Sequence, residues 1–361
     1  MKKRNYWNRK PLWDTGAQIM MAFGQNSAGK SYQGKECALV DFVLRDFVGE
    51  VLKGKTFFYV RRWAEDIKEA SCTSYFSDMP IREYTKGEWD SVEAYHGMFY
   101  FTRYNEDGDK ERSKIIGYYG ALNLWQRYKS NVYKDCDFIL FEEFISKDIY
   151  IDNEPDVFQK FMTIIFRDRP NCRVLMLGNA ISRTCPYILE WAPNVLKQKQ
   201  GTIDIYHYHD AMDEGINIDI AVEYTGYIKG TGSMTFGKSS KTILGGEWDV
   251  ENRPRLPKNR QLGYEKVYEV SIIYQKFTFI VELLVDKEEG TKIVFVYPST
   301  KGRTADRIIT DQFSDKLMTT RYFRDIPAEI YIRDCISEGR VTYSDNVTAS
   351  DFEGVYKMLG L

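Results

Sequence analysis

The stretch Gly24-Gln25-Asn26-Ser27-Ala28-Gly29-Lys30-Ser31 has the spacing G-x-x-x-x-G-K-S of a phosphate-binding loop. The apolar run at residues 19–23 predicts a buried strand before it, and apolar residues at helical spacing predict a helix after it. In this setting backbone N–H groups surround phosphate oxygens, Lys30 reaches the β- and γ-phosphates, and the Ser31 hydroxyl ligates Mg²⁺. The stretch therefore predicts binding of a nucleoside triphosphate with Mg²⁺. The apolar residues of the predicted helix are Val40, Val43, Leu44, Phe47 and Val48.

Bulk composition limits the classes of protein to which the chain can belong. Its 361 residues can bury one large core or two ordinary ones, and a net charge of −2 gives no global basic surface for a polyanion. The six cysteines include no C-x-x-C pair and there are three histidines, which disfavours a zinc site or a disulfide framework. No apolar run reaches the length of a membrane span, so we expect a cytosolic protein without a membrane partner.

The amino terminus mixes basic and aromatic residues. It is either a solvated chain end or a local contact for nucleic acid, and the sequence leaves both open. The residues concerned are Lys2, Lys3, Arg4, Tyr6, Trp7, Arg9, Lys10 and Trp13.

Short apolar strands alternate with helical stretches in the first half of the chain, a pattern typical of a mainly parallel α/β sheet covered on both faces. A predicted hairpin interrupts this pattern as an insertion around the turn at residues 105–109. The predicted strands lie at residues 56–60, 138–141 and 172–177, the helices from residue 63 and at 157–166, and the hairpin arms at 98–104 and 113–119.

The second half predicts a smaller α+β domain. Glycines cluster between residues 226 and 246, which indicates a connector. Strands are predicted at 267–274, 277–285 and 292–297, followed by a helix-rich ending from residue 305 and at 350–359. We therefore expect an ATPase domain at residues 1–205, a connector at 206–245 and a carboxyl-terminal domain at 246–361.

Two carboxylates, Glu142 and Glu143, end the predicted strand at residues 138–141. In phosphate-loop ATPases the first acid at this place holds Mg²⁺ through water, and the second polarises the water that attacks the γ-phosphorus. Glu142 occupies a position where most such proteins have Asp, so its extra methylene alters the distance to Mg²⁺. The pair favours hydrolysis over a scaffold that binds ATP without turnover.

Asn179 and two arginines flank the next predicted strand. Asn179 follows it and is a candidate to contact the attacking water or the γ-phosphate, although a turn-forming Asn is an alternative. Arg167 and Arg169 precede it. They are either finger residues for the ATP of a neighbouring subunit or surface ion pairs.

The order of these motifs resembles the DNA-packaging ATPase of small tailed bacteriophages with protein-primed linear genomes, and the resemblance runs along most of the chain. Near the carboxyl terminus, the hairpin at Tyr274, Asp286 and Pro298-Ser299-Thr300-Lys301 also look like this family. The earlier motifs are the phosphate loop, Phe58-Tyr59-Val60-Arg61-Arg62, Trp125-Gln126, Lys129-Ser130-Asn131, Glu142-Glu143-Phe144, Phe166-Arg167-Asp168-Arg169, Gly178-Asn179-Ala180 and Pro186-Tyr187.

The resemblance implies a homopentameric ring on the portal vertex of an empty capsid in the host cytoplasm, which uses ATP and Mg²⁺ to translocate double-stranded DNA. It implies an ATPase core of the additional-strand, catalytic-glutamate class, a connector, and a ribonuclease-H-like domain that has lost its cutting residues. Beyond DNA, the partners would be the portal, the capsid or a structural RNA.

The resemblance also carries residue roles. Lys30 and Ser31 would bind phosphate and Mg²⁺, Glu142 would be the metal-side acid and Glu143 the catalytic base. Arg167 matches a finger acting across the subunit interface, and Lys129 matches a lysine that supports the active site or its neighbour. A lysine of some relatives is replaced by Ala64, so Arg61 or Arg62 is the better candidate for a further trans-acting residue.

Two further possibilities concern DNA directly. Loops that hold the DNA backbone need Lys or Arg, and Lys147, just after the acidic strand, is a candidate. The alternative function is a terminase-like motor with an active nuclease in its second domain, which requires acids that converge on metal ions. Because Glu269 and Asp286 are isolated on their strands, a binding domain is favoured.

Overall fold

The structure is a computed structural model with two compact units, Met1–Trp248 and Asp249–Leu361, described here one at a time. The described residues are 6–45, 54–147, 149–167, 169, 171–192, 194–209, 217–226, 228, 248, 252–256, 263–300, 303–310, 319–320 and 322–360.

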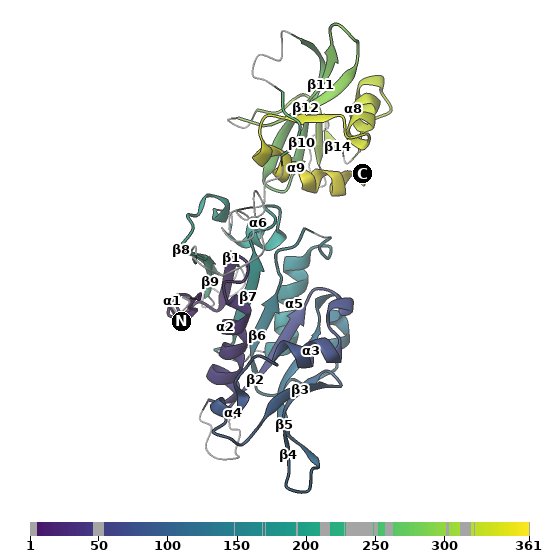
Figure 1. Cartoon of the computed structure of the whole chain (residues 1–361). Helices are drawn as coiled ribbons and strands as arrows, with labels where there is room; N and C mark the ends of the chain where they lie inside the picture. The colour runs from purple at the N-terminus through teal and green to yellow at the C-terminus, as the bar shows by residue number, and fades with distance from the viewer. Residues whose placement is uncertain are drawn as a thin grey trace. The chain divides into compact units, whose positions relative to one another are not determined.

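A large mixed sheet forms the centre of the first unit (Figure 1). Among the described residues it has nine strands in the order β3-β4-β5-β2-β6-β7-β1-β9-β8. Neighbours from β5 to β9 in this order run parallel, and antiparallel pairs occur only towards the two edges. The predicted, mainly parallel α/β sheet is confirmed. The strands are β1 Ile19–Gly24, β2 Thr56–Arg61, β3 Ser91–Tyr95, β4 Met98–Tyr104, β5 Lys110–Ala121, β6 Cys136–Glu142, β7 Arg173–Asn179, β8 Thr202–His209 and β9 Asn217–Tyr224.

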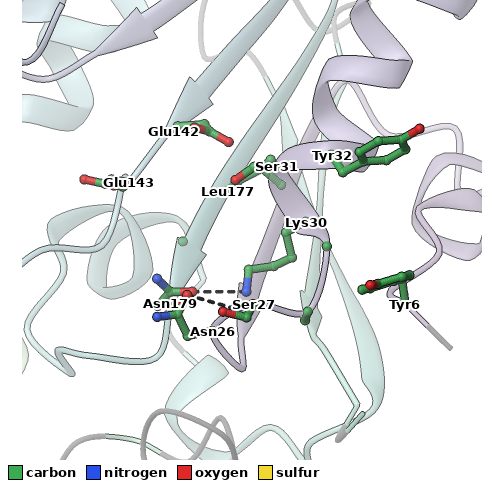
Figure 2. Close-up of a pocket in the computed structure, with 13 residues that line it drawn as sticks. Tyr6, Asn26, Ser27, Lys30, Ser31, Tyr32, Glu142, Glu143, Leu177 and Asn179 are labelled. Atoms are coloured by element: carbon green, nitrogen blue, oxygen red, sulfur yellow. Dashed lines mark hydrogen bonds between the residues drawn. The ribbon is translucent and has the colours of Figure 1, made fainter. Parts of the chain in front are cut away.

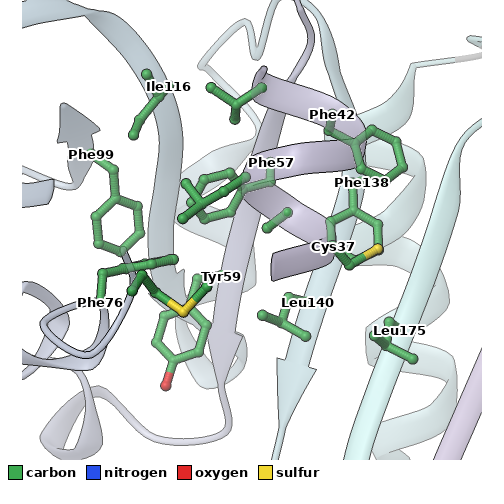
Figure 3. Close-up of a cluster of buried hydrophobic side chains, with 14 of the residues drawn as sticks. Cys37, Phe42, Phe57, Tyr59, Phe76, Phe99, Ile116, Phe138, Leu140 and Leu175 are labelled. Atoms are coloured by element: carbon green, nitrogen blue, oxygen red, sulfur yellow. The ribbon is translucent and has the colours of Figure 1, made fainter. Parts of the chain in front are cut away.

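Both faces of this sheet are buried, which explains why its central strands are continuous apolar runs. On β2, Phe57 and Tyr59 enter one hydrophobic cluster, while Phe58 and Val60 enter the other. Figure 3 shows the first cluster, where β2, β5 and β6 meet the helix that follows the phosphate loop. The α-helices of the unit are α1 Lys10–Trp13, α2 Lys30–Glu36, α3 Glu69–Tyr75, α4 Ile81–Tyr84, α5 Glu154–Phe166 and α6 Pro186–Trp191, and 3-10 helices lie at Ala64–Asp66, Leu122–Tyr128 and Val195–Lys197.

The helix expected after Lys30 forms as α2 and continues as a π-helix, η1, over Cys37–Val43. Phe47 and Val48 of the predicted helix lie outside the described residues. No helix in the part of the chain that the structure describes is long and apolar enough to cross a membrane.

The predicted hairpin is not an insertion into the sheet but part of it. Its second arm, β5, pairs in parallel with β2, so that Phe57 lies opposite Gly117. A Cβ atom at Gly117 would lie 2.6 Å from the ring of Phe57, so a residue without a side chain lets that ring pack over β5. The prediction missed this pairing because it depends on a contact across sixty residues.

The sheet also extends beyond residue 205, where we expected the first domain to end. β9 pairs in parallel with β1, with Ile19 opposite Ile220 and Phe23 opposite Tyr224. Residues 217–224 therefore lie in the sheet and not in a connector. The cluster of glycines, which suggested the connector, begins only at residue 226, and most of the predicted connector after it lies outside the described residues.

The amino-terminal segment packs against the phosphate loop. Trp7 is buried, its backbone N–H donates to the carbonyl of Ala28 at 2.9 Å, and its indole Nε1 donates to Glu223 Oε1 at 2.9 Å. Arg9 forms ion pairs with Glu36 and Asp41. Trp7 and Arg9 are therefore not part of a solvated chain end. A nucleic-acid contact of this segment stays a prediction, and Lys2, Lys3 and Arg4 lie outside the described residues.

The second unit is a smaller α+β structure. Its described strands form one sheet in the order β14-β13-β10-β11-β12-β15, in which β10, β11 and β12 are antiparallel while β13 runs parallel to β10. Helices α8 and α9 contribute to its hydrophobic core. The bounds are β10 Tyr264–Tyr274, β11 Phe277–Asp286, β12 Lys292–Pro298, β13 Ile308–Thr310, β14 Thr319–Thr320, β15 Val341–Tyr343, α8 Pro327–Ser337 and α9 Asn346–Leu359.

The helix predicted from residue 305 is wrong at its start, because Ile308–Thr310 is strand β13. All three residues are buried and pair with residues 271–273 of β10. A strand this short offers no alternation from which to predict it.

A buried ion pair holds the loop after β6. Nε of Arg62 donates to both carboxylate oxygens of Glu154, at 3.0 and 2.8 Å, and Glu154 is completely buried. The remaining guanidinium nitrogens donate to the carbonyls of Glu143 and Phe144. Arg62 thereby ties the start of α5 to the segment that carries Glu143.

Breaking this pair should destabilise the fold. Glu154→Ala leaves a buried, unpaired guanidinium, so we expect the free energy of unfolding to fall by about 3–5 kcal/mol in urea denaturation. The control is Asp156→Ala, which removes the exposed pair with Lys160 on the same helix and should cost about 0.5 kcal/mol or less. Equal effects of the two variants would contradict this account.

Candidate nucleotide site

The carboxyl ends of three neighbouring parallel strands form the site. β6 ends at Glu142, β7 at Asn179 and β1 at Gly24, and these strands are adjacent in the sheet. They meet at a cavity of about 330 Å³, shown in Figure 2. The structure thus brings together most of the site residues expected from sequence. The cavity is lined by Tyr6, Asn26, Ser27, Ala28, Gly29, Lys30, Ser31, Tyr32, Glu142, Glu143, Leu177, Gly178 and Asn179.

Two glycines give the phosphate loop its shape. Gly24 and Gly29 have φ values of 145° and 87°, which side-chain-bearing residues rarely adopt. A Cβ atom on Gly24 would also collide with the hydroxyl of Thr225, the residue that follows β9. Gln25 does not line the cavity. Its side-chain amide pairs with the backbone of Ile228, donating to the carbonyl at 3.0 Å and accepting from the N–H at 2.8 Å.

Lys30 is almost completely buried, with 6% of its surface exposed. Its ammonium donates to the carbonyl of Gln25 and to Asn179 Oδ1, the latter at 3.1 Å. Burial lowers the pKa of Lys30 to about 8, while Glu142 and Glu223 oppose that shift. The lysine therefore links the loop to the end of β7, as Figure 2 shows.

Glu142 is buried, and burial raises the pKa of its carboxyl, opposed by Ser31, Tyr75 and Arg61. Its Oε1 is buried and has no hydrogen-bond partner among the described residues. An unpartnered carboxylate oxygen close to a serine hydroxyl is the kind of oxygen donor set that Mg²⁺ prefers. Glu142 and Ser31 therefore fit the metal that the phosphate loop implies.

Glu143 differs from Glu142 in its surroundings. It follows the last residue of β6 with a φ of 59°, and its N–H donates to the carbonyl of Leu177 at 2.7 Å. Its side chain is 64% exposed, and Oε2 accepts from Nη2 of Arg61 at 2.5 Å. The two adjacent acids are thus one buried carboxylate and one solvent-facing carboxylate held by an arginine.

Arg167 and Lys129 lie together, but outside this cavity. Arg167 caps the carboxyl end of α5 and donates to the carbonyls of Lys129 and Asn131, at 3.3 and 2.6 Å. The Lys129 ammonium lies 4.5 Å from the ring centroid of Trp125. Both residues line a separate hollow of about 360 Å³. Because α5 leads into the start of β7, Arg167 lies towards the opposite end of that strand from Asn179.

The other candidate arginines have partners within their own unit. Arg169 donates to Asp137 at 2.8 Å and to backbone carbonyls, so it forms an internal ion pair. Arg62 is buried against Glu154, and Arg61 is paired with Glu143.

The remaining candidates lie apart from the cavity. Lys147 is exposed in the segment after β6, and its contact with DNA stays a prediction. In the second unit, Glu269 accepts from Lys266 and Arg303. Asp286 accepts from the backbone N–H groups of Glu288 and Glu289, which lower the pKa of its carboxyl.

Four residues near the loop were not predicted from sequence. Tyr6 and Tyr32 line the cavity, Glu223 is a buried carboxylate on β9 that influences Lys30, and Tyr75 influences Glu142. Each belongs to no motif, and only the unusual aromatic content of the amino terminus pointed to Tyr6.

A phosphate loop beside paired carboxylates at the ends of parallel strands places the chain in the class of phosphate-loop nucleotide-binding proteins. More narrowly, the chain belongs to the family described as Podovirus DNA encapsidation protein (Gp16), whose model matches residues 1–325. The family membership expected from the order of the motifs is confirmed.

Individual relatives agree with this assignment. The DNA packaging protein of Bacillus phage phi29 is 26% identical over 333 residues, covering 90% of this chain and 89% of the relative. That of Bacillus phage B103 is 30% identical over 205 residues, covering 54% of this chain and 56% of the relative.

Two solved structures share the fold. The bacteriophage Phi-29 viral genome packaging motor assembly has a TM-score of 0.58 at 21% identity and covers 98% of this chain and 99% of its own. The Phi-28 gp11 DNA packaging motor has a TM-score of 0.54 at 15% identity, with 99% of each chain covered.

Proposed function

We propose that this protein is an ATP-driven motor that translocates double-stranded viral DNA into a preformed capsid. One observation carries the proposal: in a chain of the DNA encapsidation family, the phosphate loop, buried Glu142 and exposed Glu143 line a single cavity. Both the nucleotide and the hydrolytic groups that such a motor needs therefore have a place in one subunit.

Binding of ATP exchanges the contacts of Lys30. Its ammonium leaves the carbonyl of Gln25 and the amide of Asn179 and pairs with phosphate oxygens. The attraction between the ammonium and the phosphates is strong because the lysine is buried away from water. Ser31 and Glu142 would hold Mg²⁺, which when bound neutralises negative charge on the phosphates. Asn179 is then free to contact the γ-phosphate or the attacking water.

Hydrolysis needs a base at the γ-phosphate end of the site, and Glu143 is our candidate. Its exposed carboxylate orients a water and accepts the proton that the water loses on attack. Arg61 holds this carboxylate in the present structure, and a water-orienting role requires that at least one carboxylate oxygen face the nucleotide instead.

The nucleoside end of ATP should lie against Tyr6 and Tyr32. The acids and Asn179 define where the γ-phosphate lies, and Figure 2 shows the two tyrosines on the other side of the loop. Tyr6 is 55% exposed and packs beside Gly29, so its ring offers a surface on which a base can stack.

Arg167 is proposed as a finger that acts on the ATP of a neighbouring subunit, supported by Lys129. It is exposed and does not line the cavity of its own subunit, so a trans role needs no rearrangement of the fold. Such sharing of sites requires a neighbouring subunit, and we propose a homopentameric ring at the portal vertex in the host cytoplasm. Portal, capsid and possible packaging RNA are its proposed partners.

We propose that the second unit is a binding domain with a ribonuclease-H-like sheet, joined to the ATPase domain by a connector. Its central antiparallel strands with β13 parallel to β10 support this likeness. Glu269 is engaged by Lys266 and Arg303, and Asp286 stabilises its own turn, so neither supports the alternative of an active terminase-like nuclease.

Lys147 is the proposed DNA contact.

Removing the proposed base should abolish turnover but not binding. We expect Glu143→Gln to lower DNA-stimulated phosphate release at least about 100-fold, because proton transfer to a positioned base contributes about that much. Binding of a fluorescent ATP analogue should be retained. Glu106→Gln, on the exposed turn between β4 and β5, is the control, and full activity of Glu143→Gln would refute the assignment.

The trans role of Arg167 can be tested with mixed rings. Arg167→Ala and Lys30→Ala should each be inactive alone, whereas rings containing both should regain ATPase activity. The reason is that some interfaces then combine an intact Lys30 with an intact Arg167. Arg127→Ala, at another exposed arginine, is the control. No recovery in rings shown to be mixed counts against a finger in trans.

Loss of the Tyr6 ring should weaken nucleotide binding to a similar extent whichever base the nucleotide carries. Stacking contributes about 1–3 kcal/mol, so Tyr6→Ala should weaken ATP and GTP binding by about 5–150-fold, as measured by isothermal titration. Tyr6→Trp should retain the affinity, and binding of inorganic tripolyphosphate, which has no base, should not change. Unaltered ATP affinity in Tyr6→Ala would exclude the stacking role.

A further inference from the structure

Tyr75, the last residue of α3, belongs to no motif of the site, but its ring stacks on Tyr59 of β2. Tyr59 lies opposite Leu140 of β6, and Glu142, two residues further along β6, is on the same face of the sheet. The Tyr75 hydroxyl oxygen is buried and has no hydrogen-bond partner among the described residues, and the same is true of Glu142 Oε1. Buried polar groups without partners are rare in folded proteins and need an explanation. Here one unsatisfied group is a donor and the other an acceptor.

The two groups are close enough to influence each other. The charge of Glu142 adds to burial in raising the pKa of the Tyr75 hydroxyl, and that hydroxyl in turn opposes the rise in the pKa of Glu142. Tyr75 therefore brings an unsatisfied hydroxyl donor to the face of the sheet that carries Glu142.

Tyr75 is held from two sides. Its ring stacks on Tyr59 of β2, with centroids 4.5 Å apart and an interplanar angle of 25°. From α2, the Lys35 ammonium donates to the Tyr75 carbonyl at 2.9 Å and lies 4.9 Å from the centroid of its ring. Lys35 lies one helical turn after Ser31, and β2 is the neighbour of β6. Tyr75 is thus fixed to α2, which carries Ser31, and to β2, the neighbour of the strand that carries Glu142.

We propose that Tyr75 is a positioning residue for Glu142: its hydroxyl donates a hydrogen bond to this carboxylate and holds it towards Ser31 in the nucleotide-bound site. The inference rests on the proposed function. It also accounts for Glu at a position where most such proteins have Asp. A glutamate has one more rotatable bond, so it needs an outer partner to fix the direction of its carboxylate.

The test measures metal-dependent binding and not only turnover. In the full-length protein, a non-hydrolysable ATP analogue is titrated in EDTA and at increasing Mg²⁺. Tyr75→Phe should raise the Mg²⁺ concentration for half-maximal enhancement of binding by about 10-fold or more, since loss of an outer partner typically costs 10–100-fold in metal affinity. Binding in EDTA should stay unchanged. Tyr206→Phe, which removes another buried hydroxyl on β8, should change neither quantity.

A second variant tests whether Tyr75 acts through Glu142. The shorter side chain of Glu142→Asp should not reach the Tyr75 hydroxyl, so adding Tyr75→Phe to it should have no further effect on the Mg²⁺ requirement. An unchanged Mg²⁺ requirement in Tyr75→Phe, or multiplying effects in the double variant, would overturn the inference while leaving the proposed function intact. Absence of any Mg²⁺-enhanced binding by the unaltered protein would overturn both.

Discussion

The site depends on the interactions of the buried ammonium group of Lys30. A charge removed from water needs oxygen partners, and Lys30 finds them in the Gln25 carbonyl and in Asn179 at the end of β7. Two buried carboxylates, Glu142 and Glu223, further offset the cost of burying it. The loop, three parallel strands and the amino-terminal segment bonded to Glu223 are consequently held in one arrangement around a single positive charge.

Local sequence patterns predicted the strands and the phosphate loop, whose conformations depend on residues close together in the sequence. Strands buried on both faces are apolar runs, so β1 and β6 were predictable, and the loop between β1 and α2 followed from its glycines and Lys30. Pairings set by distant residues were not predictable: β9 beside β1, and the three-residue strand β13, carry no local signal. Tyr75 was missed for the same reason, because only folding brings α3 to Glu142.

The arrangement separates the groups of the proposed reaction between two surfaces. Lys30 and the acids line one cavity, whereas Arg167 and Lys129 line another hollow towards the other end of β7. In the proposed reaction a single subunit would bind nucleotide without presenting its own Arg167 to it. Hydrolysis would then depend on contact between neighbouring subunits. Such contact would let the subunits of a ring hydrolyse ATP one after another while the ring moves DNA.

The proposed motor depends on completion of the nucleotide site by a neighbouring subunit. The most direct measurement is a structure of the assembled ring with a non-hydrolysable ATP analogue, Mg²⁺ and a short DNA duplex. We expect the guanidinium of Arg167 from one subunit to lie within hydrogen-bond distance of the γ-phosphate bound at Lys30 of the next. A γ-phosphate contacted only by residues of its own subunit, with Arg167 facing solvent or DNA, would contradict this expectation.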